Sequence, residues 1–154
     1  MPELKRCFEA AGFSDVKTIL SSGNVAFSAE PDIVTKLEST AEAAMKDHLG
    51  RVFLTIVRPS AFLQSLIEPN PFSVYGLPAS AKAVITFLRR PFEARIGLPI
   101  EQEQASILRL DGTEVFSAYV PNEKGPVFMA LLERTFGKEI TTRTLDTVRK
   151  CARA

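Results

Sequence analysis

The spacing of the apolar residues changes repeatedly along this chain, and that pattern limits the folds open to it. Stretches rich in β-branched and aromatic residues, typical of strands, alternate with stretches whose apolar residues recur every three or four positions, typical of helices. The predicted order is helix, two strands, helix, strand, helix in the first half, and strand, helix, two strands, helix, strand, helix in the second. The two orders match if one strand is missing before Met1. The sequence therefore predicts an α+β fold of two tandem ferredoxin-like subdomains (βαββαβ, α-β plait).

Residues 1–70 form the predicted first subdomain, which lacks its N-terminal strand, and residues 71–154 form the second, with a C-terminal helix. The proline- and glycine-rich stretch near residue 70 is typical of a boundary. The first half is predicted to begin with a helix from Pro2 to Gly12, followed by the strands VKTIL and VAFS, which are joined at Gly23-Asn24. A second helix is predicted from Pro31 to Gly50, with a buried stripe of Ile33, Leu37, Ala41, Ala44 and Met45. A strand VFLTIV at 52–57 and a short helix capped by Ser60 complete this half. The second half is predicted to begin with a strand KAVITFL at 82–88 and a weak helix at 92–105. Two strands, ILRL and EVFSAYV, follow around Asp111-Gly112. The last predicted elements are a helix from Pro126 to Gly137, a short strand EITT, and a basic helix from about Leu145.

The composition narrows the class of protein. A hydrophobic fraction of 45% and a charged fraction of 24% are typical of a folded globular chain. Nineteen basic residues against eighteen acidic ones leave a net charge of +1, which argues against a nucleic-acid binder held by bulk charge but leaves room for a local basic patch. The N-terminus does not resemble a secretory signal, and no apolar run approaches the ~20 residues that span a bilayer. We expect a cytoplasmic protein that is not held in a membrane.

The residue types that most often carry chemistry are few. Cys7 and Cys151 are the two cysteines, far apart on or near apolar helical stripes, so we expect buried thiols rather than a disulfide framework, a zinc cluster or a nucleophile. His48 is the single histidine and falls in the last turn of a predicted helix, where a cation interacts well with the helix dipole. These residues form no recognisable catalytic set, and we predict no metal and no cofactor.

Two short motifs are candidates for binding a ligand. Ser22, Gly23 and Asn24 belong to a glycine-containing turn whose N–H groups can cradle an anion, although ordinary turn chemistry explains the same residue types and is favoured. The second motif precedes the last helix and consists of Thr141, Thr142 and Arg143. A hydroxyl-rich helix N-terminus beside an arginine can bind phosphate, but Thr144 as a plain N-cap is the favoured alternative. We expect a ligand, if there is one, in a groove between the subdomains near both motifs.

Four stretches together carry a family resemblance: LKRCFEAAGFSDVKTILSSGNVAFS from residue 4, NPF at 70–72, ALLERTFG at 130–137, and TTR at 141–143. With them the chain resembles the bacterial domain-of-unknown-function family 1697 over nearly its whole length. The resemblance implies a pair of ferredoxin-like subdomains and no established activity.

The chain departs from this family pattern in two places. Members usually begin with a strand and a loop of the type LLRGINVGG, which are absent here, and they usually continue TTR with Asn-Trp, where this chain has Thr144-Leu145. The first departure suggests a start site placed downstream of the real one, or a shortened chain. The second alters any surface to which the tryptophan contributes.

Three functions remain open from the sequence. The leading one is a non-catalytic module that binds a small anionic ligand or a protein partner, because no catalytic set is recognisable. The second is binding of RNA or single-stranded nucleic acid through the basic C-terminal segment, which contains Arg143, Arg149, Lys150 and Arg153. The third is an enzyme that acts on a small anionic substrate, for which the SSGN turn and Arg143 must converge.

Overall fold

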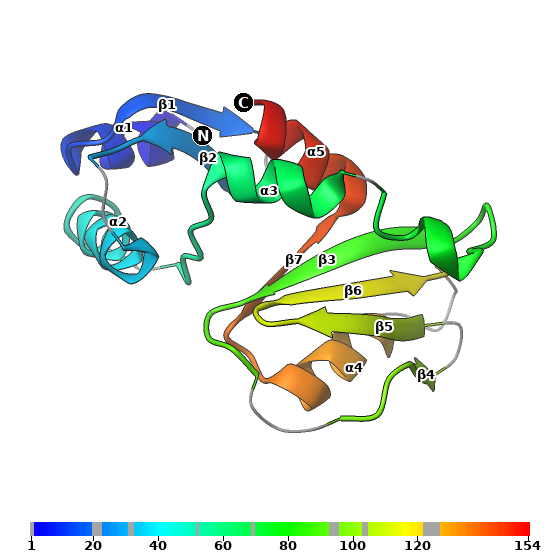
Figure 1. Ribbon diagram of the computed structural model, residues 1–154. Coiled ribbons are helices and arrows are strands. Elements are labelled where there is room, and N and C mark those ends of the chain that lie inside the picture. Colours follow the sequence, from blue (N-terminus) through cyan, green and yellow to red (C-terminus); the bar gives the residue numbers. More distant parts are fainter. Residues whose placement is uncertain are drawn as a thin grey trace. The chain divides into compact units, whose positions relative to one another are not determined.

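The computed structural model describes residues 2–19, 23–30, 33–51, 53–68, 70–92, 96–102, 105–121 and 127–154. Within these parts it is a mixed α+β protein with a two-stranded and a five-stranded sheet, both antiparallel (Figure 1). The chain divides into two compact units, one of residues 1–64 with 149–154 and one of residues 65–148. Across the described stretches, each helix is too short or too polar to cross a membrane.

The first unit begins with α1 (Pro2–Ala10), the hairpin of β1 (Ser14–Ile19) and β2 (Asn24–Ser28), and α2 (Val34–Leu49). These elements agree with the prediction, and Gly12 ends the first helical stretch with a φ of 97° that favours glycine. An aromatic cluster joins α1 to the hairpin, because the rings of Phe13 and Phe27 stack at 4.4 Å and Phe8 packs against both. Ala41 of α2 is buried in the same cluster, so α1 and α2 cover one face of the hairpin.

Two predictions in this unit are wrong. Ile33 was placed on the buried stripe of α2, yet it precedes the helix and its side chain is 68% exposed. Residues 53–57 were predicted as most of a strand, but they belong to no sheet. A strand exists only beside a partner that shares its hydrogen bonds, and within the described residues none lies beside this segment. Val52, also part of that prediction, is outside the described residues.

Two helices have residues in both units. α3 (Ser60–Ile67) begins in the first unit. Its first hydrogen bond runs from Leu63 N to Pro59 O, so Pro59 is the N-cap residue, one position before the predicted cap at Ser60. α5 (Leu145–Arg153) ends in the first unit. There Gln64 Nε2 donates to Ala152 O at 3.0 Å, which joins α3 to α5.

The second unit holds the larger sheet. Its strands are β3 (Lys82–Leu88), β4 (Ile100–Gln102), β5 (Ala105–Asp111), β6 (Glu114–Tyr119) and β7 (Ile140–Thr144), in the spatial order β4-β5-β6-β3-β7. The unit also contains the 3-10 helix η1 (Ser73–Tyr75) and α4 (Val127–Phe136). Figure 1 shows α4 against one face of this sheet. The predicted strands KAVITFL, ILRL, EVFSAYV and EITT are all confirmed.

Alternation along β3 divides the core of this unit between the two faces of its sheet. Val84 and Leu88 point toward α4 and share a buried cluster with Leu132. Ile85 and Phe116, paired across β3 and β6, lie on the opposite face and are fully buried. β3 is therefore a central strand with apolar contacts on both sides, as its continuous run of apolar residues suggests.

The weak helix predicted at 92–105 is wrong for the described residues. Residues 96–99 contain no helix, and β4 follows as a short edge strand with Ile100 paired to Ile107. Gly97 and Pro99 are poor helix formers, and the edge of β5 offers main-chain partners that a lone helical turn lacks. Residues 93–95 and 103–104 are outside the described residues.

Candidate functional site

The first ligand-binding motif predicted from the sequence is the turn of the β1-β2 hairpin. Gly23 has a φ of 86°, and Asn24 pairs with Ile19 as the last rung of the ladder. The Asn24 side-chain amide donates from Nδ2 to Ile19 O at 3.0 Å. This bond holds the amide to its own hairpin, as expected from ordinary turn chemistry, the alternative that the sequence favoured over an anion site. Ser22, the third residue of the prediction, lies outside the described residues.

The second motif is the edge strand β7. Thr142 points toward the α4 side of the sheet, where its Oγ1 lies 2.9 Å from Oγ1 of Thr86. Thr141 and Arg143 point to the other side, opposite Phe87 and Ile85. Arg143 Nη1 donates to the carbonyl oxygen of Thr142 at 2.9 Å. The three residues therefore do not converge on one point.

Thr144 ends the strand and caps α5. Its Oγ1 accepts a hydrogen bond from Thr147 N at 3.3 Å and lies 3.1 Å from Thr147 Oγ1. Asp146 stands in the first turn, where its charge favours the helix dipole. This geometry is that of an N-cap, the alternative favoured from the sequence.

Gly23 and Asn24 belong to the first unit, whereas Thr141, Thr142 and Arg143 belong to the second. The shared groove expected near both motifs stays a prediction.

The two cysteines are free thiols. Cys7 is 1% exposed in the cluster with Ala44 and Met45, and burial, with a smaller effect of the Asp47 charge, raises the pKa of its thiol. A raised pKa keeps the thiol protonated, so Cys7 behaves as a small hydrophobic residue. His48 lies in the last turn of α2, as predicted. Across the described stretches of the chain, no three His, Cys, Asp or Glu side chains are grouped in a way that would hold a metal ion.

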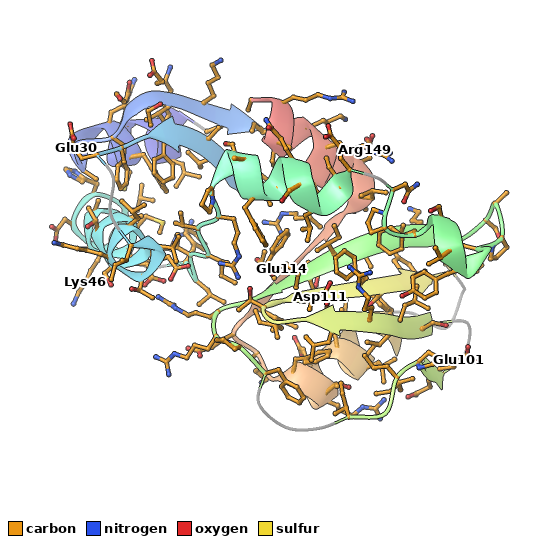
Figure 2. The ribbon with its side chains drawn as sticks, viewed as in Figure 1. Glu30, Lys46, Glu101, Asp111, Glu114 and Arg149 are labelled. Carbon is orange, nitrogen blue, oxygen red and sulfur yellow. The ribbon has the colours of Figure 1, made fainter. Side chains whose placement is uncertain are left out.

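The face of the larger sheet opposite α4 carries charge above a buried aromatic ring. The Arg109 guanidinium lies 4.6 Å from the centre of the Phe116 ring and forms an ion pair of 2.6 Å with Asp111. Asp111 and Glu114, both labelled in Figure 2, flank the turn that joins β5 to β6. Glu114 is buried and accepts a 2.7 Å hydrogen bond from Thr113 Oγ1. These charged groups are bonded within the sheet.

A feature missed by the sequence reading is the attachment of residues 53–57 to α2. Thr55 N donates to Glu42 Oε2 at 3.0 Å, and Val57 N donates to Glu38 Oε2 at 2.8 Å. Glu38 is only 2% exposed. The two glutamates are four residues apart on α2 and the two amides are two residues apart, so the segment runs antiparallel to the helix. We call residues 53–57 the α2-bound segment.

The α2-bound segment exposes two apolar side chains, whereas its main-chain groups form hydrogen bonds with polar side chains. Phe53 is 50% exposed and Leu54 is 37% exposed. The carbonyl of Phe53 accepts from Thr55 Oγ1 at 3.0 Å, and that of Val57 accepts from Arg58 Nη1 at 2.9 Å. Two local features of the sequence accompany this attachment without indicating which groups pair: an apolar run without polar alternation, and two glutamates at i and i+4 on a helix that carries alanine and methionine on its buried side.

Comparison with known proteins agrees with this architecture. The family described as Protein of unknown function (DUF1697) matches residues 1–116. Among solved structures, the chain is similar to the conserved bacterial protein SP0830 from Streptococcus pneumoniae, with a TM-score of 0.71 and 18% sequence identity, over 99% of this chain and 87% of that chain. No curated protein sequence matches. At this identity the structural likeness shows the α+β fold alone.

Proposed function

The chain belongs to the DUF1697 family of proteins of unknown function, and we propose that it acts as a non-catalytic interaction module. One observation carries the proposal: the α2-bound segment lies outside both sheets and exposes two apolar residues that are consecutive in the sequence, Phe53 and Leu54. Adjacent exposed apolar side chains on a segment without strand partners are typical of a surface that another molecule covers.

A finer description of the fold supports the same proposal. In the second unit, the order β5-β6-β3-β7 with antiparallel neighbours is the order of a ferredoxin-like sheet. The elements of the first half follow the order β1, β2, α2, α2-bound segment, α3, and those of the second half follow the corresponding order β5, β6, α4, β7, α5. We therefore propose two ferredoxin-like subdomains, of which the first has, among its described residues, no strand in the place that β3 takes in the second.

Nucleic-acid binding has less support. Ferredoxin-like sheets that bind RNA stack bases on exposed aromatic rings. The rings on the corresponding face of the larger sheet, Phe87 and Phe116, are buried, and Arg143 is hydrogen-bonded to its own strand.

Catalysis on a small anion also has less support. The Asn24 amide and the Arg143 guanidinium, which would have to bind the substrate, make hydrogen bonds within the protein. A small anionic ligand of the non-catalytic module remains the alternative to a protein partner.

We place the protein in the cytoplasm as part of the same proposal. Cys7 and Cys151 are free thiols, which suits a reducing compartment.

The proposal is tested with a photoreactive phenylalanine analogue at position 53, in the intact chain in cells. The matched control carries the analogue at Val74, which is more exposed but lies in the second unit. We expect protein adducts from position 53 and not from position 74. Equal adduct yields at the two positions would contradict an interaction surface on the α2-bound segment.

Nucleic-acid binding is tested separately by retention of a labelled single-stranded oligonucleotide at low salt. We expect no retention by the unmodified chain. Retention that falls with salt and is lost when Arg143→Ala and Arg149→Ala are combined would favour the RNA-binding alternative over the proposed function.

A further inference from the structure

We infer that Arg143 closes the open edge of the larger sheet and keeps β7 from pairing with β7 of a second copy of this chain. The residue thus acts as a guard against self-association, a role that goes beyond the proposed function and does not depend on it. A sheet edge presents a row of main-chain N–H and C=O groups, and another chain can pair with that row unless something blocks it.

The larger sheet ends in two edge strands of different length. β4 has only three residues, and so short an edge gives a second chain little to pair with. β7 has five residues, and its one neighbour among the described strands is β3. β7 is therefore the edge at which pairing with another chain has to be prevented.

The register of the sheet fixes which main-chain groups of β7 face outward. Arg89 N donates to Glu139 O at 3.2 Å, so these two residues form a hydrogen-bonded pair of the antiparallel ladder. Such pairs recur at every second residue, so Thr141 and Arg143 also turn their main-chain groups toward β3. The residues whose main-chain groups point away from β3, along the open edge, are Ile140, Thr142 and Thr144.

The carbonyl at the middle of this outward row is already occupied. Arg143 Nη1 donates to Thr142 O at 2.9 Å, and the positive charge of the donor strengthens the bond. The guanidinium therefore covers the acceptor that an incoming strand needs. It also places a charge at the edge, which is a common protection of edge strands.

A second copy of the chain is the partner that this contact excludes most directly. Two antiparallel β7 strands related by a two-fold axis would pair Thr142 with its own counterpart, and Ile140 with the counterpart of Thr144. This register uses every outward group of the edge at once. Its two central hydrogen bonds both need Thr142 O, which Arg143 holds in each copy. Pairing would therefore break two charge-assisted bonds and bring two like charges together.

The first unit has the same contact at the corresponding place. Arg58 Nη1 donates to Val57 O at 2.9 Å, which is again the carbonyl of the residue directly before the arginine. Arg58 and Arg143 each stand two residues ahead of a helix, α3 and α5 respectively. The recurrence in both units favours a common role for the contact over a chance bond at the surface.

The first test compares Arg143→Ala with Lys82→Ala in the full chain. Lys82 is exposed and lies on β3 rather than on the edge strand, so its loss controls for the removal of one positive charge from the same sheet. Sedimentation velocity over a range of protein concentrations measures self-association. We expect Arg143→Ala to associate about tenfold more tightly than the unmodified chain, and Lys82→Ala to behave like the unmodified chain.

A second pair of variants separates edge pairing from general misfolding. In the Arg143→Ala background, Thr142→Pro and Thr142→Ala both remove the side-chain hydroxyl, but only proline also removes the outward N–H. Because this N–H does not bond to β3, the edge position can accept proline. We expect the double variant with alanine to associate and the double variant with proline to stay monomeric.

Amide hydrogen exchange locates the contact. Exchange at Ile140, Thr142 and Thr144 should slow as the concentration of Arg143→Ala rises. Equal self-association of Arg143→Ala and Lys82→Ala would overturn the inference. Equal association of the two double variants would overturn it as well, because pairing through the outward N–H groups would then play no part. An unmodified chain that already pairs through β7 would show that Arg143 does not close the edge.

Discussion

Replacing Glu38 by glutamine tests the attachment of the α2-bound segment to α2. The change keeps the size of the side chain and an acceptor oxygen but removes the charge that assists the 2.8 Å bond from Val57 N. A hydrogen bond to a charged group contributes about 1.5–3 kcal/mol and a neutral one about 0.5–1.5 kcal/mol. We expect Glu38→Gln to lower the free energy of unfolding by about 1 kcal/mol, which is about 3 °C in Tm for a chain of this size.

Glu38→Ala is the stronger form of the same test. It removes the acceptor altogether and leaves the Val57 N–H unsatisfied beside a small cavity. The expected loss is about 3 kcal/mol, from the unsatisfied donor and the lost packing together. Glu42→Gln should cost less than Glu38→Gln, because Glu42 is only half-buried and its bond to Thr55 N is 3.0 Å.

Urea denaturation and hydrogen exchange at the Val57 amide measure these effects globally and locally. Glu101→Gln, at an exposed edge position, is the control for loss of a surface charge and should change stability by less than about 0.5 kcal/mol. If Glu38→Gln behaves like Glu101→Gln and the Val57 amide stays protected, the carboxylate does not hold the segment and the reasoning fails.

Three further predictions concern buried polar groups. Cys7 should resist alkylation until the chain is unfolded, while half-buried Cys151 reacts first. Because burial raises the pKa of Cys7, the unfolded chain loses its thiol proton before the folded chain does as the pH rises above about 8.5. The free energy of unfolding should therefore fall above this pH, and the fall should be smaller in Cys7→Ala. A pH profile of stability that the substitution leaves unchanged would contradict this prediction. Ser117→Ala should raise stability by about 1 kcal/mol in thermal unfolding, because the buried hydroxyl has no hydrogen-bond partner among the described residues; a loss would show that it has one. Thr86→Val and Thr142→Val should each cost about 1 kcal/mol, and a double-mutant cycle should show coupling across their 2.9 Å contact; simple additivity would refute the bond.

Most elements could be predicted from the sequence because their signals are local. Gly12 and Gly50 end their helices in left-handed conformations, and the Asp111-Gly112 turn joins two strands as its residue types predict. The predicted strand at 53–57 failed because a strand depends on a neighbour that local sequence cannot supply. The predicted helix near Gly97 failed because an available sheet edge outweighed a weak helical pattern.

The candidate site was predictable in part. The residue types at Asn24 and Thr144 suggested either an anion site or ordinary capping, and their hydrogen bonds support capping. The sequence could not reveal that Glu38 and Glu42 bind the main chain of Thr55 and Val57, because the partners are more than ten residues apart and on different elements. Such a contact depends on where α2 and the next segment pack.

The sequence by itself determined the α+β class, the order of most elements and the turns, because periodicity and turn chemistry act over a few residues. The tertiary structure alone decided which apolar segments became strands. KAVITFL became the central strand β3 between two neighbours, whereas residues 53–57, equally apolar, became a segment held by two carboxylates. The physical reason is that a strand's hydrogen bonds belong to the pair, so its formation depends on a partner located elsewhere in the fold.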